Sequence, residues 1–148
     1  MLDKPIGYKT WLLVADGEKA LFLQNMGDGE LPNFEIRRVK EHENPPDRDQ
    51  GANMPGRMPD ASGNHRSAVQ DTDWHELEKE RFAIELSDIL YKMAHRGRFD
   101  KIVLVAPPKI LGELRQHLHK EVQSRVVGEI DKDFTNHPVG KMEKLLAA

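Results

Sequence analysis

The chain has 148 residues, enough for one ordinary domain and too few for two cores of typical size. Its 22 Lys and Arg nearly balance 25 Asp and Glu, and the net charge of −3 excludes a uniformly basic nucleic-acid binder. The absence of cysteine excludes disulfides, thiolate nucleophiles and cysteine-ligated metals. Since no apolar run approaches the roughly 18 residues of a membrane helix, we expect a cytoplasmic protein without membrane insertion.

Three short apolar runs predict strands in the first forty residues. Segment 10–15 is almost continuously apolar and ends at Asp16 and Gly17, which is typical of a central strand buried on both faces and followed by a turn. Segments 20–24 and 34–39 predict the next two strands. Together the three predict an antiparallel meander.

Segment 41–72 has a different character. It contains four prolines and three glycines among polar residues and shows no apolar period, so it cannot bury a face. Loops longer than about 15 residues are uncommon inside compact domains and are usually functional or disordered. We therefore predict a long mobile loop over 41–72 that acts in binding.

The rest of the chain alternates helices and strands. Asp73 and Glu76 have capping-box spacing and begin a helix that ends near Gly97. One face of this helix is predicted to be apolar, at Leu77, Phe82, Ala83, Leu86, Ile89, Leu90 and Met93. There follow, in order, a strand over 101–106, a helix over 108–122, a strand over 125–130 and a helix opening at Pro138.

This order predicts one domain over 1–148 with an α/β fold. Three antiparallel strands extended by two parallel ones form the sheet, and right-handed crossovers place helices on both of its faces. The arrangement, βββ, long loop, αβαβα, is a ribonuclease-H-like mixed sheet.

A nuclease of this fold needs carboxylates for two Mg²⁺ ions from the first strand, the first helix and the end of the fourth strand. Asp16 fits the first place, and a glutamate of the predicted helix fits the second. The fourth strand ends at Ala106-Pro107-Pro108, which offers no carboxylate, and Asp131 and Asp133 substitute only by an unusual geometry. Turn formation is the favoured interpretation of Asp16, and a metal-dependent nuclease is the lesser alternative.

The remaining polar residues predict no metal and no cofactor. His117 and His119 are two apart on a predicted helix, so they point to different sides and cannot share an ion; we expect both to be solvated. Ser62 and His65 lie in a loop, whereas a catalytic triad needs a rigid scaffold. Basic residues gather in two places: Arg48, Arg57 and Arg66 on the loop, and Arg96 and Arg98 at the end of the first helix. They predict a local face that contacts phosphate; the alternative for Arg96 and Arg98 is that they complement the dipole of the helix.

Four segments carry a resemblance to known proteins. Residues 11–17, 80–86, 104–115 and 129–135 resemble, in order and spacing, bacterial proteins named for a requirement in attachment to host cells. That family is similar to the central domain of archaeal and eukaryotic class I peptide release factors, whose fold is ribonuclease-H-like. The Ala-Pro-Pro-Lys stretch that ends at Lys109 is the most specific piece.

The resemblance also implies where to look for function. In the release-factor domain, a Gly-Gly-Gln loop before the long helix enters the peptidyl-transferase centre and helps water to cleave peptidyl-tRNA. Gly63-Asn64 is the nearest equivalent, with serine in place of one glycine and a shorter amide. The resemblance therefore implies a fold and a contact with ribosome or tRNA rather than peptide release.

We thus predict a non-enzymatic binding protein. The expected binding loop comprises Arg57, Ser62, Gly63, Asn64, His65 and Arg66. A possible groove beside the first strand comprises Asp16, Lys109, Asp131 and Asp133. The alternative is that the chain binds a protein partner and acts indirectly in host-cell attachment.

Overall fold

The computed structural model describes residues 4–41 and 68–147, the side chains of 68–73 excepted. Its elements are β1 (Trp11–Ala15), β2 (Lys19–Asn25), β3 (Phe34–Glu41), α3 (Ala68–His95), β4 (Ile102–Val105), α4 (Pro108–His117), α5 (Lys120–Gln123), β5 (Val126–Ile130) and α6 (Val139–Leu146). Within these ranges, no helix combines the length and apolar character needed to cross a membrane.

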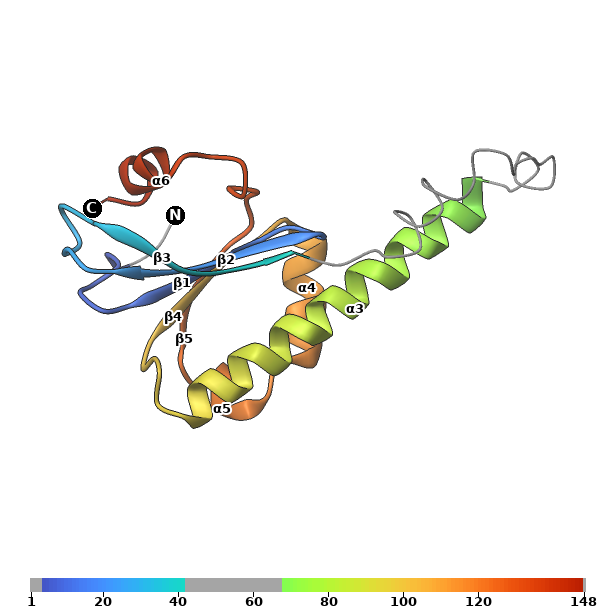
Figure 1. The fold of residues 1–148 in the computed structure, drawn as a ribbon, viewed down its shortest axis with the longest axis horizontal. Coiled ribbons are helices and arrows are strands. Elements are labelled where there is room, and N and C mark those ends of the chain that lie inside the picture. Colours follow the sequence, from blue (N-terminus) through green and yellow to red (C-terminus); the bar gives the residue numbers. More distant parts are fainter. Residues whose placement is uncertain (1–3, 42–67, 148) are drawn as a thin grey trace.

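The five strands form one mixed sheet in the order β3-β2-β1-β4-β5. β1, β2 and β3 are antiparallel neighbours, whereas β4 pairs parallel with β1, and β5 pairs parallel with β4. Helices α3, α4 and α5 cover one face, and α6 covers the other (Figure 1). The predicted α/β class is confirmed, and the arrangement is consistent with a ribonuclease-H-like fold.

Alternation along β1 divides the interior into two cores. Leu13 belongs to the core under α3, α4 and α5, whereas Leu12 and Val14 belong to the core under α6. Because successive side chains of a strand point to opposite faces, an unbroken apolar run requires cover on both sides. All five residues of β1 are buried, which confirms the predicted central strand.

The long helix begins earlier than the sequence pattern predicted. α3 starts at Ala68, so residues 68–72 are helical, and Glu41 belongs to β3; the predicted loop boundaries 41 and 72 are therefore wrong. Residues 68–72 contain neither proline nor glycine, so nothing in their backbone chemistry stops the helix there. The remainder of the predicted loop lies outside the described residues.

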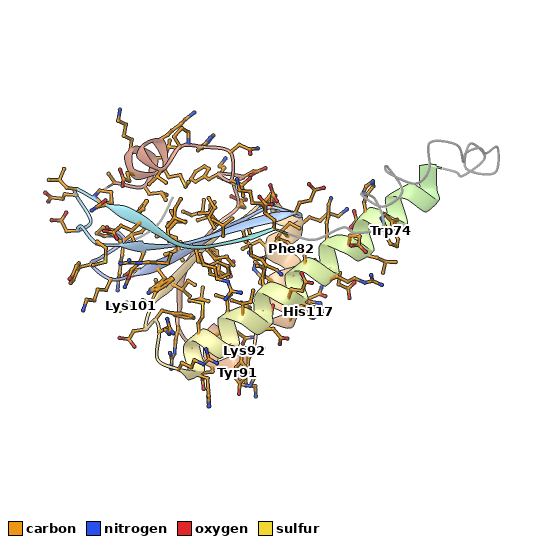
Figure 2. The ribbon with its side chains drawn as sticks, in the orientation of Figure 1. Trp74, Phe82, Tyr91, Lys92, Lys101 and His117 are labelled. Carbon is orange, nitrogen blue, oxygen red and sulfur yellow. The ribbon has the colours of Figure 1, made fainter. Side chains whose placement is uncertain are left out.

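α3 packs on the sheet over part of its length. Its 28 residues span about 42 Å. Phe82, Leu86 and Leu90 are fully buried, whereas Leu77, predicted for the same face, is 51% exposed. Figures 1 and 2 show the reason, because the amino-terminal turns of α3 extend past α4 and away from the sheet.

The single helix predicted over 108–122 is two helices. Leu118 has extended backbone angles, and the His119 side chain caps α5 by accepting the amide of Glu121. Leu118 nevertheless stays buried, so the apolar period continues across the break. This continuity is why the hydrophobic pattern did not reveal the break.

Asn25, at the end of β2, is a fully buried polar residue. Its Nδ2 donates toward the carbonyls of Ile6, Gly7 and Asp28, at 2.8, 3.2 and 3.2 Å. Its Oδ1 accepts two backbone amides of the β2–β3 connection, each at 2.9 Å. One amide side chain thus holds the amino-terminal segment and the β2–β3 connection together.

We expect Asn25→Asp to lower the free energy of unfolding by about 3 kcal/mol, because a carboxylate there faces carbonyl oxygens without a donor. Urea denaturation followed by circular dichroism measures this loss. The matched control is Asn33→Asp, at an exposed position of the same connection. Equal stabilities of the two variants would contradict the role given to Asn25.

Candidate functional site at the carboxyl ends of the parallel strands

The topology brings the four predicted groove residues to one edge of the sheet. Asp16 follows β1, Lys109 lies in the first turn of α4 just after β4, and Asp131 and Asp133 follow β5. These three strands are parallel, so their carboxyl ends meet. In open α/β sheets, ligands bind at this edge.

Asp16 and Asp133 converge on a buried hydroxyl. Asp16 Oδ1 accepts the amides of Glu18 and Lys19 at 2.7 Å each, which confirms the turn role predicted for it. Asp16 Oδ2 lies 2.9 Å from Thr135 Oγ1, and Asp133 Oδ1 lies 2.7 Å from the same oxygen. A threonine hydroxyl carries one proton, so it donates to one carboxylate at a time. The contact joins the β1–β2 turn to the segment before α6.

Lys109 is held by an ion pair with α3. Its Nζ lies 2.6 Å from Glu76 Oε1, and Lys79 Nζ lies 4.0 Å from the same oxygen. The hydrogen bond from Lys109 is the main cause that lowers the pKa of the Glu76 carboxyl, and the charges of Lys109 and Lys79 lower it further. Glu76 therefore pairs with a cation of α4 while 38% of its side chain stays exposed.

Gly17 permits the close approach of α3 to this edge. A Cβ at Gly17 would lie 3.0 Å from Cγ of Lys79, which is tighter than nine in ten such contacts, so the lysine side chain would have to shift. The β1–β2 turn, α3 and α4 are thus drawn together around Gly17, Lys79 and Glu76.

Asp131 is not among the hydrogen-bond partners found for the Thr135 hydroxyl, which are Asp16 and Asp133. It is exposed, and its charge helps to raise the pKa of Arg115, after the larger effects of the hydrogen bond and the charge of Glu129. Among the described residues, no third carboxylate or histidine joins Asp16 and Asp133 at metal-ligand spacing. The two-magnesium nuclease stays a prediction that lacks its third ligand in the described part of the chain.

The six residues of the predicted binding loop, Arg57, Ser62, Gly63, Asn64, His65 and Arg66, lie outside the described residues. They precede α3 in the sequence. α3 begins at Ala68, at the end that extends from the sheet (Figure 1).

A cleft of about 1270 Å³ lies at the opposite, amino-terminal ends of β1 and β4. Its lining includes four cationic residues, Lys4, Lys9, Arg98 and Lys101, against two acidic ones, Asp100 and Glu129. Tyr8, also in the lining, is 59% exposed. The sequence analysis grouped Arg98 with Arg96 and the loop arginines, and Arg96 does not line the cleft. The other three cations were missed, since they come from separate segments that only the fold brings together. Asp16, Lys109, Asp131 and Asp133 do not line this cleft.

The expected solvation is correct for His119, which is exposed, and wrong for His117, whose Nε2 is buried. His117 Nε2 is buried between α3 and α4, 3.7 Å from Glu113 Oε2 and 3.9 Å from Glu80 Oε1. The His119 ring lies with its centroid 4.3 Å from that of Tyr91, and its Nδ1 caps α5. Contacts with α3 and the break between α4 and α5 give both rings partners that spacing along one helix could not reveal.

The five-stranded mixed sheet defines an α/β domain, in which the Ala-Pro-Pro-Lys segment leads from β4 into α4. The family model that matches residues 9–146 is bacterial archaeo-eukaryotic release factor family 12, and the chain belongs to this family. A search of curated proteins gave no match. The release-factor part of the resemblance is confirmed, whereas the part concerning attachment to host cells stays a prediction.

We expect Lys109→Gln to raise the pKa of Glu76 toward its ordinary value of 4.5, because the main cause of its lowering is removed. A carboxyl whose folded pKa is lowered stabilises the fold above its unfolded pKa and loses that contribution as the pH falls through the folded pKa. Carboxyl NMR titration of both proteins between pH 2 and 7 measures the shift. Arg37→Gln, on β3, is the charge-matched control; an unchanged Glu76 titration in Lys109→Gln would contradict the assignment.

Proposed function

We propose that this protein is a non-enzymatic, release-factor-like binding protein that contacts the ribosome or tRNA through segment 41–72. The observation that supports the proposal is the family match across residues 9–146. Apart from its ends, which belong to β3 and α3, the segment comes between that strand and the long helix in the chain. The resemblance to release factors implies a functional loop just before the long helix.

The composition of the segment supports contact with RNA. Arg57 and Arg66 supply cations for phosphate, and Asn64 and His65 supply hydrogen-bonding groups. The segment meets α3 at the end that projects from the sheet. A partner of ribosomal size can therefore approach this end without displacing the packed part of α3.

The cationic cleft supports the same class of partner from a second surface. Lys9, Arg98 and Lys101 are exposed and lie at the far end of α3 from Ala68. Exposed Tyr8 adds an aromatic ring of the kind that stacks on unpaired bases. RNA can thus meet positive charge at two separate places, although the net charge of the chain is negative.

We expect binding to purified ribosomes or tRNA to weaken with salt, and the double variant Arg57→Ala, Arg66→Ala to bind more weakly. The loss of two phosphate contacts makes the negative slope of log K against log salt shallower by about 1.4, on the single-strand value of about 0.7 per contact. Filter binding or cosedimentation at roughly 50, 100 and 200 mM salt measures the affinity and its salt dependence.

The matched control is Arg37→Ala with Arg81→Ala, which removes the same charge from β3 and α3, where each arginine already pairs with a glutamate. The proposal requires this control to bind as the wild type does. Absence of binding by the wild type at every salt concentration would refute the proposal.

A protein partner is the second candidate, favoured by an apolar stripe on α3. Trp74, Leu77 and Ile84 are 38, 51 and 41% exposed. Their spacings of three and seven residues place them on one side of the helix, away from buried Phe82. Such a stripe suits the apolar groove of another protein, and a partner of this kind could connect the protein indirectly with host-cell attachment.

If the partner is a protein, capture from a nuclease-treated lysate should retain it, and Trp74→Ser with Leu77→Ser should reduce its recovery at least several-fold. Quantitative mass spectrometry of the captured proteins measures recovery. Leu31→Ser with Leu145→Ser, at exposed apolar positions elsewhere, is the control. Loss of every captured protein after nuclease treatment would instead favour RNA.

A further inference from the structure

The crossing of α3 and α4 brings together three groups of metal-ligating type. Glu80 lies on α3, and Glu113 and His117 lie one turn apart on α4. One ligand atom from each residue falls within a common distance of 4.8 Å. Within the described ranges, this is the one group of three or more such residues with this spacing.

The histidine points into the cluster with its nitrogen unsatisfied. His117 Nε2 is buried and has no hydrogen-bond partner among the described residues. Its nearest acidic atoms are Glu113 Oε2 at 3.7 Å and Glu80 Oε1 at 3.9 Å, both beyond hydrogen-bond length. A buried nitrogen without a partner is costly and calls for a proton donor, an acceptor or a metal.

A cation would reduce the repulsion between the two partly exposed carboxylates. Among the described residues, the one cationic group paired with Glu80 or Glu113 is His117 itself. The nearby Lys79 and Lys109 pair with Glu76, and Arg81 pairs with Glu78. Two carboxylates that approach the same point repel each other unless positive charge lies between them.

The spacing is close to what a metal ion would require. With bonds of about 2.1 Å, two ligands of a tetrahedral zinc lie about 3.4 Å apart. The three ligand atoms lie within 4.8 Å of one another, and both distances from His117 exceed 3.4 Å, so the ligands need to draw closer around an ion. Rotations of the flexible glutamate side chains provide this movement. The backbone is already fixed, because Phe82 on α3 and Leu114 on α4 are fully buried beside the cluster.

We infer that Glu80, Glu113 and His117 form a binding site for a divalent transition-metal ion, with Zn²⁺ as the ion of best fit. One imidazole nitrogen and two carboxylate oxygens suit Zn²⁺, whereas Mg²⁺ and Ca²⁺ prefer oxygen ligands alone. Figure 2 shows His117 where α4 meets α3. Glu80 is about half exposed, so the ion can enter from solvent and keep water in its open position. The bound ion would clamp the two helices together, independently of any RNA contact.

The test is Zn²⁺ titration of the metal-stripped full chain by isothermal calorimetry. We expect one site that Mg²⁺ does not fill, and an affinity at least about 100-fold lower in Glu80→Gln and in His117→Asn, because each loses a direct ligand. Co²⁺ as a probe should give a visible absorption band in the wild type that His117→Asn abolishes.

His75→Asn, at an exposed position on α3, is the matched control and should leave both signals unchanged. Glu80 is on the surface, so Glu80→Gln stays folded, which circular dichroism verifies. The inference is overturned if the wild type binds no Zn²⁺, or if Glu80→Gln and His117→Asn bind Zn²⁺ as the wild type does. A His117 that merely pairs with the two carboxylates would give that second result.

Discussion

The whole arrangement depends on the burial of β1 and β4 on both faces. Every residue of these two strands is buried, so apolar helices must cover the sheet from both sides. α3, α4 and α5 supply one cover and α6 supplies the other (Figure 1). The parallel pairing of β1 with β4 then brings the turn after β1, the start of α4 and the segment after β5 to one edge. Both the predicted groove residues and the crossing of α3 and α4 owe their positions to this constraint.

The two ends of the sheet differ in how their charges are used. At the carboxyl end, Asp16 and Asp133 bind the buried Thr135 hydroxyl, and Lys109 binds Glu76. These contacts tie segments of the fold to one another. At the amino end, Lys9, Arg98 and Lys101 line an open cleft. Asp16, Asp133 and Lys109 thus bind other parts of the fold, while cations from separate segments of the chain line the cleft.

Strand positions were predictable because burial leaves a direct mark on sequence: the five apolar runs became β1 to β5, shifted at their ends by a residue or two. The break at Leu118 was hidden, since Leu118 stays buried while its backbone changes direction. The contacts of the site were harder to predict than the strands, because they join residues that are distant in sequence. Asp16 could be placed after a strand, but Thr135 is 119 residues away from it in sequence, and no local pattern joins the two. Glu113 and His117 have a spacing that suggests a shared face, whereas Glu80 joins them only through the packing of α3 on α4.

Because α3 packs over only part of its length, a small tilt of the packed part produces a larger displacement of its amino-terminal end. The helix contacts α4 at Glu76, which pairs with Lys109, and about 12 Å of helix precedes Glu76. A tilt of about 10° around Glu76 would displace Ala68 by about 2 Å, at the 1.5 Å rise per residue of a helix. A partner that binds the amino-terminal end of α3 therefore also acts on its contact with α4, and the packing of that contact limits how far the helix can tilt.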